Sequence, residues 1–158
     1  SAALRDGGLH MAGAVKNVIA IATGISDGMK LGSNARAALM TRSVHEIKRL
    51  GMALGANSET FSGLAGIGDL IVTCATDLSR NRRCGLLIGD GLKAEEAVEK
   101  VGSVVEGYYT ADAVYDLAGK LGVEMPVCMA TRAVLKGEIA PDKAVRMLMS
   151  RSKKDEVQ

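Results

Sequence analysis

Apolar residues recur every three or four positions along most of this chain, and that spacing restricts it to helices with one buried face. From Ala12 to about Met29 the apolar positions are Val15, Val18, Ile19, Ala22 and Ile25. Further along, Asn34 is placed to cap a helix that runs to about Leu54, with Gly55 as its C-terminal stop.

The second half of the chain continues the same pattern. Residues 94–101 predict a short amphipathic helix, and Thr110 is placed to cap another. Pro126 opens a helix to about Lys136, and Pro141 opens the last one, before a charged tail that we expect to fray. Segments of strand character are scarce, so the sequence predicts an all-α, multi-helix bundle of seven or eight helices.

Composition narrows the class of protein. Among 158 residues, only 3% are aromatic, with no Trp, so aliphatic residues and eight Met must fill the core. The net charge of +2 argues against a broad surface for nucleic acid, and no apolar run is long enough for a membrane span. Cys74, Cys84 and Cys128 fit reduced thiols, which favours a cytoplasmic protein.

The first residues are treated separately. Residues 1–11, "SAALRDGGLHM", lack a clear period and resemble expression-tag or cloning residues, which leaves 12–158 as one helical domain. His10 and His45 are the two histidines, and no Cys or His pair has ligand spacing, so we expect no metal site. The stretch "GDGLKA" at 89–94 matches a dinucleotide-binding loop, but without a surrounding βαβ unit we interpret it as a turn between helices.

Positive charge is concentrated in "LSRNRRCG", residues 78–85, which holds three arginines. Arginine presents a planar fork of donors that suits phosphate or carboxylate, so the stretch could bind an anion. It could equally be a solvated helix end with its usual basic residues.

A second polar group lies within apolar sequence. Lys16 and Asn17 interrupt an apolar helix, and Asp69 precedes an apolar run with Thr73 four residues later. If Lys16 and Asp69 meet in a cleft, burial and mutual charge would set the proton affinity of the lysine, as acid–base catalysis requires. An ordinary ion pair at a helix terminus remains the alternative.

Four stretches taken together resemble a known family: "AVKNVIAIATGISDGMKLGSNARAALMTRS", "GLAGIGDLIVTC", "LSRNRRCG" and "VVEGYYTADAV" followed by "GVEMPV". Over residues 12–150, they resemble the C-terminal substrate-binding domain of bacterial NAD(P)-dependent glycerol-3-phosphate dehydrogenases. The resemblance implies a helical domain similar to that of 6-phosphogluconate dehydrogenase. It also implies hydride transfer between NAD or NADP and a small phosphorylated substrate, dihydroxyacetone phosphate, which yields glycerol 3-phosphate for phospholipid synthesis.

The resemblance further implies roles for single residues. Lys16 matches the family's acid–base lysine and Asp69 a catalytic residue beside it. Asn17, Thr73, Ser79, Arg80 and Asn81 match substrate contacts, and Arg80, Val104 and Glu106 match positions that reach the cofactor. A homodimer is possible by the same resemblance.

The nucleotide-binding domain of that family is absent from these 158 residues. We therefore expect the isolated chain to fold, to bind the substrate phosphate weakly at most, and to show no turnover. Two other classes of protein stay open: a non-enzymatic helical module that binds an anionic partner, and a nucleic-acid-binding helical domain, which the charge balance disfavours.

Overall fold

The structure, a computed structural model, describes residues 2–55 and 79–157, and every regular element in these ranges is a helix. The helices are α1 (Ala2–Gly28), α2 (Ser33–Ala53), α5 (Arg80–Gly89), α6 (Ala94–Val101), α7 (Glu106–Leu121), α8 (Pro126–Leu135) and α9 (Pro141–Val157). The predicted all-α bundle is confirmed for the described part of the chain.

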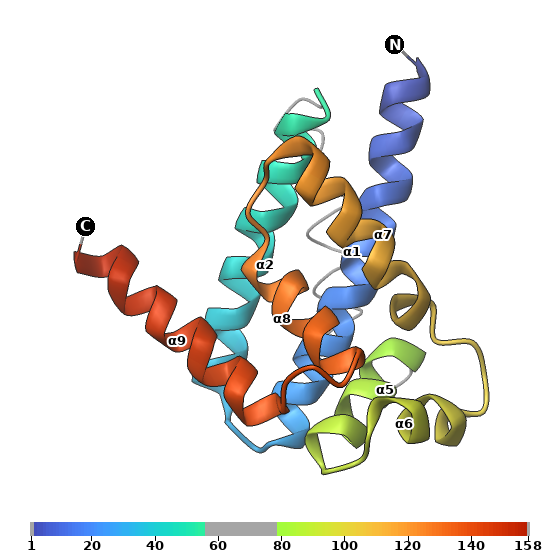
Figure 1. The fold of residues 1–158 in the computed structure, drawn as a ribbon, viewed down its shortest axis with the longest axis vertical. Helices are drawn as coiled ribbons and strands as arrows, with labels where there is room; N and C mark the ends of the chain where they lie inside the picture. Colours follow the sequence, from blue (N-terminus) through green and yellow to red (C-terminus); the bar gives the residue numbers. More distant parts are fainter. Residues whose placement is uncertain (1, 56–78, 158) are drawn as a thin grey trace.

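The long helix α1 is the centre of the fold. It contacts α2, α5, α7 and α8, and its middle turns are buried all around. The fully buried apolar residues there are Val15, Val18, Ile19, Ala20 and Ile21. Figure 1 shows α9 leading away from the other helices, with α8 as its main contact.

Helix bounds agree with the sequence pattern where proline or apolar spacing set them. The helix over 94–101 and the starts at Pro126 and Pro141 are confirmed, and Gly55 adopts a left-handed φ of 82° just after α2. The helix predicted from Ala12 instead begins at Ala2, because residues 2–11 include strong helix formers such as Ala, Leu and Arg.

Two predicted caps are wrong, and so is the frayed tail. Helix α2 begins at Ser33 with Gly32 as its N-cap and no side-chain cap, so Asn34 lies inside the first turn. Helix α7 begins at Glu106, which places Thr110 inside it. Helix α9 continues to Val157 through the tail expected to fray.

The contact between α1 and α5 is made by glycines. A Cβ on Gly24 would lie 2.2 Å from the carbonyl oxygen of Arg82, and one on Gly85 would lie 2.1 Å from the carbonyl oxygen of Ile21. Gly28 and Gly89 repeat the arrangement one turn further on, with distances of 2.4 and 2.3 Å to backbone oxygens. Glycine spaced by four on both helices thus brings the two backbones into direct contact.

The remaining expectations concern cysteines, metals and membranes. Cys84 and Cys128 are free and buried, and burial raises the pKa of Cys84 to about 11, whereas Cys74 lies outside the described residues. In the described ranges no cluster of His, Cys, Asp and Glu could hold a metal ion. No helix in those ranges is long and apolar enough to cross a membrane.

Candidate functional site

The arginine-rich stretch forms the N-terminal turn of α5. Ser79 is the N-cap, and its hydroxyl accepts a hydrogen bond of 3.3 Å from the backbone N–H of Arg82. A helix N-terminus carries partial positive charge, so arginines gathered there are unfavourable unless they meet negative charge. The alternative of an ordinary basic helix end therefore loses support, since basic side chains stabilise the other end of a helix.

The three arginines of this stretch differ in their surroundings. Arg82 is buried and binds the carboxylate of Asp27, and Arg83 donates a 3.4 Å hydrogen bond to the carbonyl of Val101. Arg80 is exposed and makes no hydrogen bond or ion pair within the described ranges. Arg80 and Arg83 are thus both exposed to an external anion, and Arg80 is the one without a partner among the described residues.

Asn81 connects α5 to α7. Its Oδ1 accepts a 2.8 Å hydrogen bond from the backbone N–H of Gly107, in the first turn of α7. Val105, the N-cap residue of α7, has no side-chain acceptor, so Asn81 supplies the missing cap from another helix. With its oxygen occupied, the side chain of Asn81 offers only N–H donors to a ligand, as a phosphate or hydroxyl oxygen would require.

Asn17 reaches the same turn of α7 from α1. Its Nδ2 donates a 3.1 Å hydrogen bond to Oε2 of Glu106. A Cβ on Gly107 would lie 2.9 Å from both the Asn17 carbonyl oxygen and Oδ1 of Asn81, so only glycine fits between these residues. The structure thereby brings residues 17, 81 and 106 together, although they lie far apart in sequence.

For the other predicted site residues, the structure gives the position and exposure of Lys16 and Val104 but does not describe Asp69 and Thr73. Lys16 is half-buried on α1, next to Asn17, and Val104 is 61% exposed just before α7. Asp69 and Thr73 lie outside the described residues, so the predicted meeting of Lys16 and Asp69 stays a prediction.

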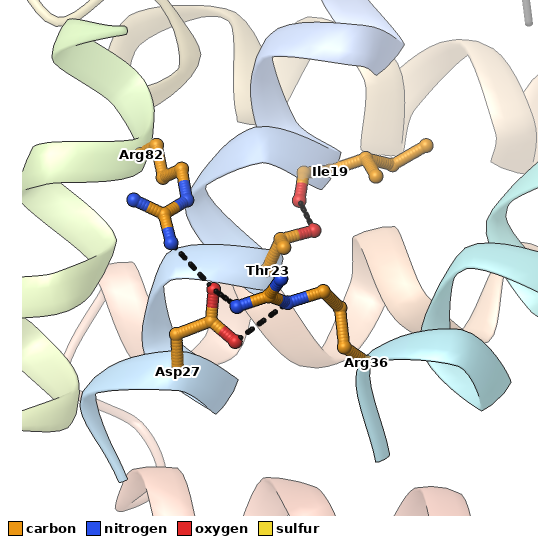
Figure 2. A network of polar contacts seen from close by, with 5 residues as sticks. All are labelled: Ile19, Thr23, Asp27, Arg36 and Arg82. Carbon is orange, nitrogen blue, oxygen red and sulfur yellow. Dashed lines mark hydrogen bonds and ion pairs between the residues drawn. The ribbon is translucent and has the colours of Figure 1, made fainter. Parts of the chain in front are cut away.

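A buried carboxylate escaped the sequence analysis. Asp27 lies in the last turn of α1 and accepts hydrogen bonds from Arg82 of α5 at 2.7 Å and from Arg36 of α2 at 2.9 Å (Figure 2). An acidic residue in the last turn of a helix is disfavoured by the helix dipole. That misplaced charge in "SDG" was the available signal that Asp27 has a cationic partner.

Comparisons with known proteins agree with this architecture. A family model described as "NAD-dependent glycerol-3-phosphate dehydrogenase C-terminus" matches residues 7–146. The match begins at residue 7, within the segment whose sequence resembles a tag. The assignment of residues 1–11 to a tag stays a prediction.

Several similar relatives are bacterial dehydrogenases. Glycerol-3-phosphate dehydrogenase [NAD(P)+] of Dechloromonas aromatica is 55% identical over 150 residues, which are 95% of this chain and 46% of the relative. The crystal structure of the Coxiella burnetii glycerol-3-phosphate dehydrogenase superposes with a TM-score of 0.86 at 48% identity, covering 90% of this chain and 44% of that one.

A distant relative shows the same fold. Glycerol-3-phosphate dehydrogenase of Saccharomyces cerevisiae gives a TM-score of 0.77 at 28% identity over 86% of this chain and 40% of that one. The chain therefore spans less than half the length of these relatives. By the family match and the 55% identity, it belongs to the family of C-terminal domains of NAD(P)-dependent glycerol-3-phosphate dehydrogenases.

Proposed function

We propose that this chain supplies the substrate-binding half of a dehydrogenase that interconverts dihydroxyacetone phosphate and glycerol 3-phosphate with NAD(P). The observation that carries the proposal is the convergence of Asn17, Asn81 and Glu106 at the first turn of α7. Arg80, beside Asn81, supplies an exposed cation at a helix N-terminus. Cation, helix dipole and amide donors together suit a phosphate group.

The acid–base role falls to Lys16. During reduction its ammonium group would donate a proton to the substrate carbonyl oxygen as hydride reaches the carbonyl carbon, so that no free alkoxide forms. In the opposite direction the neutral amine would take the proton of the hydroxyl group. Asp69 would stand beside Lys16, and Thr73 would contact the substrate, by the family resemblance.

Holding the phosphate falls to the start of α5. Ser79 and Arg80 would bind the phosphate oxygens, and Asn81 would add an N–H donor whose direction is fixed because its oxygen is held by Gly107. Asn17 is fixed in the same way, because its amino group is held by Glu106, which leaves its oxygen to accept from a substrate hydroxyl.

The cofactor would be NAD or NADP, which supplies the hydride when bound. The residues at the start of α7 fit a nucleotide: Glu106 presents an exposed carboxylate that can accept from ribose hydroxyls, and Val104 presents an exposed apolar surface. Arg80 is next to Asn81 in the sequence, so the same side chain would contact both the substrate phosphate and the phosphates of the cofactor. Most of the nucleotide contacts would come from a domain that these 158 residues do not include.

The test uses a chimera in which residues 7–146 replace the matching segment of the Dechloromonas aromatica relative. The chimera should oxidise NADH or NADPH when dihydroxyacetone phosphate is added. Lys16→Ala should lower kcat by about 100- to 10,000-fold, the usual contribution of a general acid. Lys48→Ala is the matched control, since it removes a half-buried lysine of α2 outside the site.

Two results would contradict the proposal. A folded chimera without turnover would contradict the proposal that this chain is half of a dehydrogenase active site. An unchanged kcat in Lys16→Ala would favour the non-enzymatic anion-binding module. A homodimer and a cytoplasmic location belong to the same proposal and are supported by the family resemblance alone. Sedimentation velocity of the chain and fractionation of cells that express the full-length protein test them.

A further inference from the structure

We propose that the ion pair between Asp27 and Arg82 positions the phosphate-binding turn of α5 against α1, which makes Asp27 a positioning residue for substrate binding. This inference rests on the proposed function, and it gives two arginines of "LSRNRRCG" different roles. Arg80 contacts the ligand, whereas Arg82 holds the turn that carries it.

The contacts of the pair show how the turn is held. Nη2 of Arg82 lies 2.7 Å from Oδ2 of Asp27, and their side chains are only 7% and 10% exposed. Arg36 binds the same carboxylate at 2.9 Å but is 43% exposed. Figure 2 shows the carboxylate of Asp27 between the two guanidinium groups, one from α5 and one from α2.

Both charges of the pair stand at the wrong end of their own helix. Asp27 lies at the negative C-terminal end of α1, and Arg82 lies at the positive N-terminal end of α5. Neither placement stabilises its own helix. The favourable energy of the arrangement therefore comes from the contact between the two helices.

The glycine interface explains why such a contact is needed. Gly24, Gly28, Gly85 and Gly89 let the backbones of α1 and α5 meet without interlocking side chains. Interlocking ridges and grooves are what normally fix how one helix is placed along another. A directional, buried ion pair beside this glycine contact supplies that placement instead. Its arginine, Arg82, follows the proposed phosphate-binding residues 79–81 directly in the sequence.

The first test uses the chain itself and does not depend on catalysis. Hydrogen exchange of the backbone amides of residues 83–88 should become at least about tenfold faster in Asp27→Asn, because the first turns of α5 lose their anchor. Amides of α8 should keep their exchange rates. Asp112→Asn, which breaks an exposed ion pair of α7 with Arg132 and Lys136, is the matched control and should leave α5 unchanged.

The second test measures kinetics in the chimera. In Asp27→Asn the KM for dihydroxyacetone phosphate should rise roughly 10- to 100-fold, since misplacement by about an ångström costs that much. The kcat/KM for unphosphorylated dihydroxyacetone, which lacks the group that the α5 turn would hold, should stay within about twofold. A role in stability alone would lower the amount of active enzyme and leave the KM unchanged.

Conservative variants keep the inference open to contradiction. If Asp27→Asn does not fold, Arg82→Lys retains the charge but not the planar geometry, and it should show the same selective rise in KM. Arg36→Ala, which removes the exposed partner of Asp27, should change the KM by less than about threefold. An unchanged KM in a folded Arg82→Lys variant, with unchanged exchange in α5, would overturn the inference while leaving an active chimera, and with it the proposed function, intact.

Discussion

Glu46 is a carboxylate with no exposed surface, located on α2 against the start of α8. Its Oε1 accepts a hydrogen bond from the backbone N–H of Val127, so it satisfies one of the free donors at the N-terminus of α8. Burial raises the pKa of Glu46 from 4.5 to about 7, although the backbone N–H groups at the start of α8 act in the opposite direction. The fold therefore contains a buried acid that titrates near neutral pH.

This raised pKa predicts how stability depends on pH. The folded state holds a proton on Glu46 that the unfolded state releases above pH 4.5, so the contribution of Glu46 to the free energy of unfolding is largest below that pH and falls until about pH 7. A shift of this size corresponds to about 3 kcal/mol. Urea unfolding of Glu46→Gln between pH 4 and 8 should lack this loss, because glutamine keeps an acceptor for Val127 and carries no charge.

A matched variant separates the effect of the buried Glu46 carboxyl from the effect of removing any negative charge. Glu96→Gln removes an exposed carboxylate from α6 and should keep the full loss of stability between pH 4.5 and 7. If Glu46→Gln and the unchanged chain lose the same free energy over that range, Glu46 is not the titrating group.

Residue types at the site could be predicted from the sequence, but their partners could not. The chemistry of Ser79 and Arg80 left an anion site and a basic helix end both open, the family resemblance implied substrate contacts, and the structure places both residues at a helix N-terminus. Asn81 was expected to contact the substrate, yet its oxygen caps α7 from a distance of 26 residues in sequence. No local pattern shows a cap supplied by another helix, because Val105, the residue at the cap position, has no polar side chain.

Among the elements, α1 and α5 form the contact that the site depends on. Helical spacing predicted α1, α6 and α8, because the apolar face and the prolines are local signals. The pairing of α1 with α5 is recorded in glycines four residues apart on each helix and in the misplaced charges of Asp27 and Arg82, and neither signal by itself names its partner. Sequence therefore predicted which helices form better than which helices meet.

Gly24→Ala tests this contact directly. The new Cβ would lie 2.2 Å from the carbonyl oxygen of Arg82, which is backbone and cannot turn aside. Overpacking of this kind costs about 1–3 kcal/mol or more, so the free energy of unfolding should fall by at least that amount in urea unfolding. In the chimera, the KM for dihydroxyacetone phosphate should rise as well, because α5 is pushed away from α1.

Gly119→Ala is the matched control for this prediction. Gly119 lies inside α7, and nothing lies within 4 Å of the position of its Cβ. Alanine is the better helix former, so this variant should gain about 0.5–1 kcal/mol. Equal effects of the two substitutions would show that α1 and α5 are not in backbone contact.

Helix α1 organises both the core and the candidate site. The described site residues lie on α1, on α5 and α7, or directly before these two helices, and both α5 and α7 pack on α1. Among the described side chains of the last helix, α9, the core includes Ala144 and the half-buried Leu148. Damage to the centre of α1 should therefore cost far more than damage to α9.

Two truncations of similar size measure this difference. Ile19→Ala removes a side chain with no exposed surface from the middle of α1 and should lower the free energy of unfolding by about 2–5 kcal/mol. Leu148→Ala removes a half-buried side chain from α9 and should cost about 1 kcal/mol, because only part of its area leaves water on folding. Urea unfolding with an unchanged m-value would confirm that both variants lose stability and keep the same fold. If Leu148→Ala costs as much as Ile19→Ala, then α9 belongs to the core, and α1 is not the element on which the rest of the molecule depends.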